Sequence, residues 1–428
     1  MLFSSTNTLQ KSAHAYRDIS EQFVIDASFL WLLRSISVKQ PHYYLTDLAD
    51  LEKRIDANLD GLMCNFELAW EICLEELRFD QAGEAFTATI IAFRSRDVNK
   101  IKVVIDHAFV NDDTFKGVAS AMAWLPKPLI REWLERFLFS KDLNHKQLAI
   151  AFCSITRKNP GECLKEFLQR EDCLSHIGLL KRVVRLIGEL KLYAFGNALL
   201  PLAEHEDIDV KFWANWSIVM LGEHKYAANL QAYLLSDSPF SSIAQQVIFK
   251  VLPIDKARLL ISDFATQPER LREVIQASGL IGDPHTVPWI IDKMNNFDTA
   301  KVAGEAFTLI TGIDLDRYEL SIEPPEDIAA VPNDEHANSN VDLDEDENLP
   351  FPNVSKINHT WLHYRARYKA GSRYIMGIEV NQNNPATVAK LTSMLKQAGQ
   401  RQRASIALTL ALLDPQSSFV NVKARSLV

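Results

Sequence analysis

Several features that mark particular classes of protein are scarce or missing in this 428-residue chain. Glycine occurs only 15 times, and few segments alternate apolar and polar residues with period two, which argues against a mainly β fold. No segment holds the run of about 18 apolar residues that a membrane-spanning helix needs. The N-terminus, MLFSSTNTLQKSAHAYRD, lacks the apolar core of a signal peptide. We therefore expect a protein with neither a membrane span nor a cleaved leader.

The chain also lacks a basic excess and an even set of cysteines. Its formal net charge of −9 argues against general nucleic-acid binding. Five cysteines make an odd number, which together with the missing signal indicates reduced thiols in a cytoplasm. Cys153, Cys163 and Cys173 recur every ten residues, whereas zinc sites favour ligand pairs about two to four residues apart. We interpret these cysteines as small buried apolar groups.

Motifs for phosphate binding and nucleophilic catalysis are missing as well. There is no G-x-x-x-x-G-K-[ST], no G-x-G-x-x-G after an expected strand and no G-x-S-x-G. Gly282-Asp283-Pro284 is the nearest approach to a phosphate-binding turn, but Pro284 has no backbone N–H to offer an anion. A helix corner accounts for all three residues: Gly282 ends one helix, Asp283 caps the next, and Pro284 suits its first turn.

Two segments of the sequence partly match known metal-binding motifs, but each lacks required residues. His359 and His363 stand one helical turn apart, but the glutamate of H-E-x-x-H and a third ligand are missing. The acidic run that begins at Asp342 lacks the glycine of a calcium loop at its sixth position, and Asn353 stands at its twelfth. We predict no metal, no cofactor and no catalytic residue.

What the sequence does contain is helical spacing. The segment 47–59 carries Leu48, Leu51, Ile55 and Leu59 on one stripe, with Gly61 as the expected stop, and 66–77 forms a second striped helix. From residue 83, helices rich in small residues recur roughly every 30 residues, and most are followed by a breaker and a second helix. Stacked helix pairs bury a shared core in this way, and Ala, Gly and Ser allow close approach.

The pattern predicts an all-α, HEAT-like α-solenoid with terminal caps; a non-repetitive helical globule is the alternative. We divide the chain into an N-terminal helical cap (1–82), HEAT-like repeats (83–318), a flexible acidic linker (319–352) and a C-terminal cap (353–428). Within the C-terminal cap, 371–380 is the best candidate for a short strand pair, and a helix pair follows it.

One basic and aromatic cluster in the C-terminal cap is the candidate binding site. Arginine and aromatic residues together are typical of protein-interface anchors. The alternative is that these cations bind the acidic linker or fill gaps at the end of the array. The predicted partner-binding residues are Trp361, Tyr364, Arg365, Arg367, Arg373, Tyr374, Arg401 and Arg403.

Three sets of segments carry a family resemblance. They are Phe29 to Leu62 with AWEICLEEL, then LIGDPHTVPWII with Gly304 to Asp316, and finally LPFP, GSRYIMGIEV and Gly399 to Leu413. Through them the chain resembles an uncharacterised proteobacterial family of HEAT-like repeat proteins, often encoded near type VI secretion components. The resemblance implies a cytoplasmic accessory role and supplies no catalytic residues.

The leading hypothesis is a non-enzymatic protein-binding scaffold of the type VI secretion context. It would bind an effector or spike component as an adaptor or chaperone, or, alternatively, neutralise a cognate secreted toxin as an immunity protein. The competing class is an enzyme with convergent polar residues in a concave face. A nucleic-acid-binding repeat protein would instead need a continuous basic stripe, which the acidic balance disfavours.

Overall fold

The computed structural model describes residues 3–234, 238–324, 346–381, 384–414 and 417–426, and within these ranges it is an all-α protein. The chain forms two compact units. Unit 1 comprises Met1–Lys39, Tyr43–Ala214 and Asn421–Val428, and unit 2 comprises Gln40–His42 and Asn215–Val420. The boundary at Ala214 falls inside segment 83–318, which the sequence pattern assigns to a single run of repeats.

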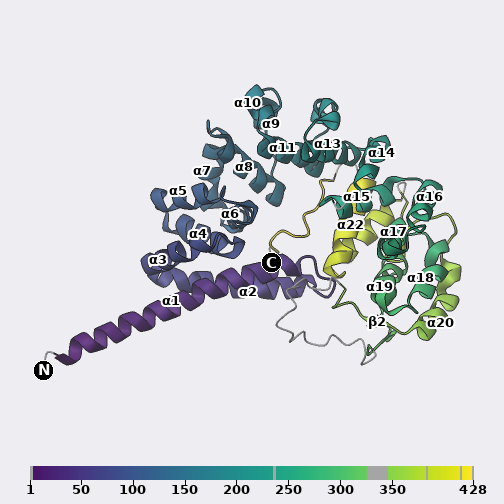
Figure 1. The fold of residues 1–428 in the computed structure, drawn as a ribbon, viewed down its shortest axis with the longest axis horizontal. Helices are drawn as coiled ribbons and strands as arrows, with labels where there is room; N and C mark the ends of the chain where they lie inside the picture. The colour runs from purple at the N-terminus through teal and green to yellow at the C-terminus, as the bar shows by residue number, and fades with distance from the viewer. Residues whose placement is uncertain (1–2, 235–237, 325–345, 382–383, 415–416, 427–428) are drawn as a thin grey trace. The chain divides into compact units, whose positions relative to one another are not determined.

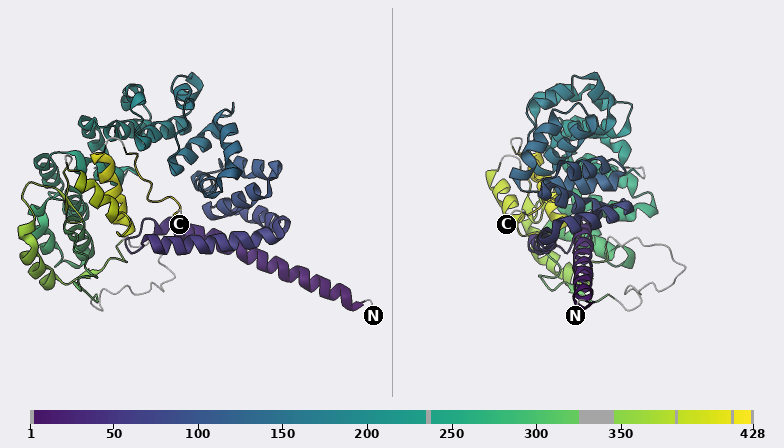
Figure 2. Two further views of the ribbon diagram at one scale, coloured as in Figure 1. Left: turned by 180° about the vertical axis from the view of Figure 1, so that it is seen from behind. Right: turned by 90° about the vertical axis from the view of Figure 1, so that its left-hand side faces the viewer.

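Unit 1 is built from helices that pack in succession. Helix α1 packs on α4, α4 on α6, α6 on α8, and α8 on α11. Figure 1 shows α4, α6 and α8 following one another, with α3, α5 and α7 to their left. Both views in Figure 2 show α1 extending beyond the rest of the unit. The helices are α1 (Phe3–Ser37), α2 (Leu45–Leu62), α3 (Phe66–Glu76), α4 (Ala82–Ser95), α5 (Val98–His107), α6 (Asp112–Trp124), α7 (Lys127–Leu138), α8 (Leu143–Thr156), α9 (Cys163–Phe167), α10 (Glu171–Ser175), α11 (Ile177–Leu190), α12 (Gly196–Leu199) and α13 (Ile208–Met220), the last of which continues into unit 2.

Small residues set the close spacing of these helices. A Cβ added to Gly117 of α6 would lie 2.2 Å from the backbone oxygen of Ala82 on α4. A Cβ on Gly83 would lie 2.6 Å from the backbone oxygen of Ser28 on α1. The expectation that small residues allow close helix packing is therefore confirmed at these positions. Gly61 does not end its helix as predicted: α2 continues to Leu62. Instead, the lack of a side chain at Gly61 leaves room for the Phe23 ring, which would lie 2.7 Å from an added Cβ.

Unit 2 has a similar succession of helices and two short strand pairs. Helix α15 packs on α17, α17 on α19, and α22 against α15, as Figure 1 also shows. Its helices are α14 (Ala227–Leu230), α15 (Ser241–Val251), α16 (Ile254–Phe264), α17 (Leu271–Ile281), α18 (Val287–Lys293), α19 (Phe297–Thr311), α20 (Val354–Tyr364), α21 (Pro385–Met394) and α22 (Gln400–Leu413). Strand β1 (Ser321–Ile322) pairs antiparallel with β2 (Phe351–Pro352), and β3 (Tyr374–Ile375) with β4 (Ile378–Glu379).

The C-terminal part of unit 2 agrees with the elements expected from the sequence. Strands β3 and β4 confirm the strand pair predicted within 371–380, and α21 and α22 confirm the final helix pair. Of the predicted acidic linker, residues 325–345 lie outside the described residues. Its two described ends pair with each other as β1 and β2.

Gly282-Asp283-Pro284 is a helix corner, as predicted. Gly282 ends α17 in the left-handed region at φ 70°, and the Asp283 carboxylate accepts a hydrogen bond from the His285 N–H at 3.1 Å. Pro284 opens the following 3-10 turn. Asp283 is fully buried and is also held by Arg258, whose Nε lies 2.7 Å from its carboxylate. The corner is therefore fixed by an ion pair as well as by its own capping bonds.

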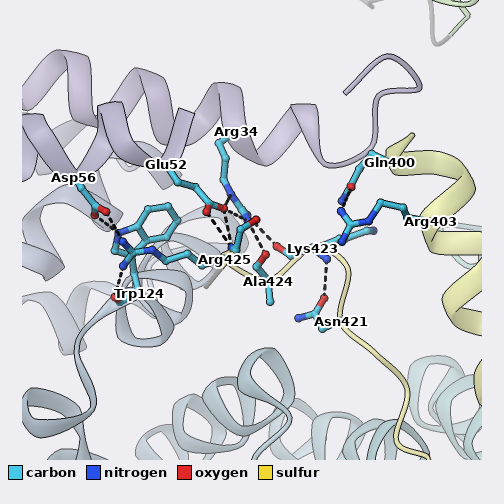
Figure 3. Close-up of polar contacts among 11 residues, drawn as sticks. Arg34, Glu52, Asp56, Trp124, Gln400, Arg403, Asn421, Lys423, Ala424 and Arg425 are labelled. Atoms are coloured by element: carbon cyan, nitrogen blue, oxygen red, sulfur yellow. Dashed lines mark hydrogen bonds and ion pairs between the residues drawn. The ribbon is translucent and has the colours of Figure 1, made fainter. Parts of the chain in front are cut away.

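The last described residues of the chain, Asn421–Ser426 (the C-terminal tail), pack on unit 1 (Figure 3). Arg34 of α1 donates to the backbone oxygens of Lys423 and Ala424, both at 2.9 Å, and pairs with Glu52 of α2. The Ser426 N–H donates to Glu52 at 2.9 Å. The Asn421 amide donates to the backbone oxygen of Ile155 on α8 at 2.9 Å. The tail thereby joins α1 and α2 to α8 within unit 1.

Arg425 fixes the same tail to a third position. Its guanidinium lies 4.5 Å from the centroid of the Trp124 ring and forms an ion pair with Asp56 of α2. Asp56 also accepts a hydrogen bond from the Trp124 indole N–H at 2.9 Å. Figure 3 shows these side chains meeting where α2, the end of α6 and the tail converge.

Candidate functional site

The predicted basic and aromatic cluster lies in unit 2, and the structure divides it into buried and exposed parts. Trp361 and Tyr374 are buried in the core of this unit. Tyr368 lies between them, with its ring centroid 5.3 Å from that of Trp361 and 5.0 Å from that of Tyr374. The Tyr368 hydroxyl donates to the backbone oxygen of Thr311 at the end of α19. These rings hold α20 and β3 against the helices of unit 2.

Arg373 binds the C-terminal end of α15. Its guanidinium donates to the backbone oxygens of Phe249 and Lys250, both at 2.7 Å, and to that of Leu252. The last carbonyls of a helix have no partner within the helix and carry partial negative charge, so a cation there is favourable. Arg373 thus caps a helix that lies more than 100 residues earlier in the chain.

The residues after Arg373 cap two further helices with their own backbone. The Tyr374 N–H donates to the Gly282 oxygen at 2.7 Å, just past the end of α17. The Met376 and Gly377 N–H groups donate to the Leu309 and Ile310 oxygens near the end of α19, at 2.6 and 3.0 Å. The β3–β4 hairpin therefore runs across the C-terminal ends of α15, α17 and α19 and satisfies carbonyls in each.

Arg401 and Arg403 are also engaged within unit 2. Arg401 lies 2.9 Å from the Glu305 carboxylate on α19 and 3.6 Å from that of Asp346. Arg272 of α17 pairs with the same Asp346 at 2.9 Å. Burial raises the pKa of Glu305, and the Arg401 charge opposes that shift. Arg403 donates to the Leu395 oxygen at 2.9 Å and to the Gln400 side chain.

Asp346 belongs to the segment predicted as the acidic linker. Its contacts with Arg401 and Arg272 match the alternative in which cations of the cluster bind acidic residues of the same chain. For Arg401, the structure therefore shows an intramolecular partner. Asp342, Asp344 and Glu345 of the same run lie outside the described residues, whereas Glu347 is described and its backbone oxygen accepts a hydrogen bond from Lys301.

Tyr364, Arg365 and Arg367 form the accessible part of the predicted cluster. Arg365 and Arg367 are exposed, and Tyr364 is half-buried. The Arg367 guanidinium lies 4.4 Å from the centroid of the Tyr364 ring. Neighbouring Leu362 is 51% exposed. We call Leu362, Tyr364, Arg365 and Arg367 the α20 rim. It combines an apolar group, a ring and two cations at the end of one helix, the residue types of an interface anchor.

Lys250 of α15 is not among the residues predicted from the sequence. Its position three residues after buried Val247, on the apolar stripe of the helix, is the signal that could have indicated it. Its Nζ lies 2.8 Å from the Ser405 hydroxyl and 3.0 Å from the Thr409 hydroxyl of α22. Burial, together with the smaller effect of the nearby Arg373 charge, lowers the pKa of Lys250 to about 7. The ammonium group is thus held as a link between α15 and α22.

The remaining sequence candidates carry no site in the described parts of the chain. His359 and His363 lie on α20 without a third ligand, since no group of three or more His, Cys, Asp or Glu suited to a metal occurs among the described residues. Cys73, Cys153, Cys163 and Cys173 are buried free thiols, as predicted for the last three, and Cys64 is an exposed one. Burial raises the pKa of Cys153 to about 12, which opposes thiolate chemistry.

Comparison with protein-family models, curated proteins and solved structures finds no match. No helix among the described residues is both long and apolar enough to cross a membrane.

Proposed function

We propose that this protein is a non-enzymatic protein-binding scaffold with the architecture of a HEAT-like solenoid. Successive packing of α4, α6, α8 and α11 in unit 1, and of α15, α17 and α19 in unit 2, supports a repeat array. Such arrays present long surfaces on which a partner protein can lie. The polar groups described in unit 2 mainly cap helices or join them, which favours a structural framework over a reaction centre.

The observation that carries a binding role is the α20 rim. Arg365 and Arg367 are exposed and form no ion pair with any described residue, whereas Arg373, Arg401 and Arg403 of the same predicted cluster are engaged inside unit 2. Exposed arginines beside Tyr364 and Leu362 can bind a partner through charge, stacking and apolar contact. The proposed contact is therefore narrower than the set of residues predicted from the sequence.

The family resemblance gives this scaffold a context. We propose a cytoplasmic accessory of type VI secretion that binds an effector or spike component as adaptor or chaperone. A pull-down of the tagged chain from its native host, followed by mass spectrometry, tests this. Recovery of a secreted toxin or a spike protein is expected, and recovery of neither contradicts the proposal.

The α20 rim is tested in the same experiment. The double substitution Arg365→Ala/Arg367→Ala should reduce capture of the identified partner. Arg317→Ala is the matched control, because Arg317 is an exposed arginine of unit 2 outside the rim. Equal capture by the rim variant and the control would remove the rim from the binding surface.

An immunity role is the second form of the same proposal and needs its own measurement. Co-expression with a captured toxin separates the two roles. An immunity protein restores growth of cells that produce the toxin, whereas an adaptor changes only delivery of the effector. Rescue of growth would replace the adaptor role with the immunity role.

A further inference from the structure

Unit 1 contains a second group of basic residues, separate from the α20 rim and from the segments that carry the family resemblance. Lys116 of α6 and Lys423 of the C-terminal tail are exposed to solvent, and Arg182 and Arg185 of α11 are partly exposed. We call these four residues the unit 1 basic face. They come from two helices and the tail, so only folding brings them together.

The charges on the basic face act on one another. The Lys423 side chain is exposed, but the surrounding chain partly desolvates its ammonium group, which lowers its pKa. The charges of Lys39, Arg185 and Lys116 lower that pKa further, with no carboxylate among the main influences. Burial and the Lys39 charge also lower the pKa of Lys116, opposed by Asp113. Burial and the Arg185 charge lower the pKa of Arg182 to about 10, opposed by Asp112 and Glu189. The repulsion is only partly offset by Asp112, Asp113 and Glu189, and at Lys423 no carboxylate is among the main influences, so these cations destabilise the folded state.

Arg182 shows the shortage of anions most directly. Its Nε is buried and has no hydrogen-bond partner among the described residues, and the side chain forms no ion pair with them. The guanidinium lies 4.2 Å from the centroid of the Phe115 ring, which holds it in place. A buried donor without a partner destabilises the folded state. The rest of the Arg182 side chain is partly exposed, so its charge is available to an external carboxylate.

Aromatic rings hold the other cations as well. The Arg185 guanidinium lies 4.3 Å from the centroid of Trp213 and pairs with Glu189 at 2.9 Å. The Lys116 Nζ lies 5.8 Å from the centroid of Trp31. These contacts reduce the freedom of the side chains before any ligand arrives, which lowers the entropy lost on binding.

The features of the face select among anionic partners. Phe115, Trp31 and Trp213 are buried, and each already has a cation beside it, so these rings are not free platforms for nucleic-acid bases. The net charge of −9 opposes any long polyanion, so it favours a short acidic segment over an extended phosphate backbone. Carboxylates can bind separate cations without needing a stacking surface.

We propose that the unit 1 basic face binds an acidic polypeptide segment of a partner protein, whose carboxylates contact Lys116, Lys423 and Arg182. The C-terminal tail is then part of the binding surface, since it supplies Lys423. Arg34, Glu52 and Arg425 fix the tail and so position that lysine. This binding site is independent of the α20 rim, and either can fail without the other.

The test measures binding of the full-length chain to a fluorescein-labelled glutamate-rich peptide of about a dozen residues by fluorescence anisotropy, at low salt and at about 0.15 M salt. A glutamine-substituted peptide and a single-stranded oligodeoxynucleotide of equal charge are the comparison ligands. Saturable binding of the glutamate peptide that weakens with salt is expected. The glutamine peptide should not bind.

The variant Lys116→Gln/Lys423→Gln should weaken binding about tenfold or more. Lys102→Gln/Lys141→Gln is the matched control, because it removes the same charge from exposed lysines elsewhere on unit 1. The control should bind within about twofold of the wild type. The Tm of the basic-face variant should be equal or higher, because two mutually repelling charges are removed, so weaker binding cannot reflect unfolding.

Three results would overturn the proposal. They are no saturable binding of the glutamate peptide, equal binding by the basic-face variant and the control, or tighter binding of the oligodeoxynucleotide than of the peptide. The last result would replace an acidic polypeptide with a nucleic acid as the ligand of this face.

Discussion

The Nζ of Lys250 on α15 lies 2.8 Å from the hydroxyl of Ser405 on α22. The contact joins two helices of unit 2 that are 155 residues apart in the chain. Among the residues that the structure describes, hydroxyl groups but no carboxylate lie at bonding distance from this ammonium group. The pKa of Lys250, lowered to about 7 mainly by burial, reflects that environment.

Lys250→Met should therefore stabilise the protein at neutral and lower pH. The folded pKa of about 7 lies below the ordinary value of 10.5, so between these values the unfolded state holds more protons. The wild-type free energy of unfolding consequently rises with pH from about 7 to about 10. At pH 6 both states are protonated and the full cost of burial is present, so the variant should gain on the order of 2 kcal/mol.

Urea unfolding at pH 6, 7.5 and 9 measures this effect. The gain of Lys250→Met over the wild type should shrink as the pH rises. Lys256→Met is the control, because Lys256 is an exposed lysine in the neighbouring helix α16. A gain that does not change with pH would show that the Lys250 charge carries no penalty.

Arg373→Ala should destabilise unit 2 by about 2–3 kcal/mol, since it leaves the oxygens of Phe249, Lys250 and Leu252 without their charged donor. Arg365→Ala should change the free energy of unfolding by less than about 0.5 kcal/mol, because Arg365 is exposed. Denaturant unfolding of both variants is the measurement. Similar losses for the two arginines would contradict the division of the cluster into structural and accessible parts.

Gly282→Ala separates backbone strain from steric contact. A Cβ at Gly282 would lie 2.0 Å from the Tyr374 oxygen, in addition to requiring φ 70°. Gly371 has φ 80° but nothing within 4 Å of an added Cβ. We expect Gly371→Ala to cost about 1 kcal/mol from φ alone, and Gly282→Ala about 3 kcal/mol or more because the β3 strand must move. Equal changes in Tm for Gly282→Ala and Gly371→Ala would indicate that the β3–β4 hairpin moves away from the added Cβ without a loss of stability.

Arg34→Met should destabilise unit 1 by about 3 kcal/mol, because it leaves the buried Glu52 carboxylate without its cation and frees the tail oxygens. The double variant Arg34→Met/Glu52→Met should recover part of that loss. Denaturant unfolding measures the loss of stability, and hydrogen exchange of the tail amides measures release of the tail. Lys53→Met, which removes one partner of an exposed ion pair, is the control. A double variant less stable than Arg34→Met would mean that the Glu52 charge is compensated by other groups.

Local features of the fold could be predicted from the sequence because they depend on residues close together in the chain. The corner at Gly282-Asp283-Pro284 follows from the conformational preferences and capping ability of those three residues. The striped helix that contains Leu48 and Ile55 follows from their helical spacing, and the hairpin at β3 and β4 from its apolar residues beside glycine. Gly61 was misinterpreted because a glycine that ends a helix and one that admits a neighbouring ring look alike in sequence.

The role of each cation was decided by the tertiary structure alone. Arg365 and Arg373 are eight positions apart and equally basic, yet one is exposed and the other caps α15. Lys116 and Lys423 belong to one basic face although about 300 residues separate them. Periodicity and turn chemistry therefore determined the helices and their corners. The partners of each charged side chain depended on distant carbonyls, carboxylates and rings, whose positions are set only when the helices pack.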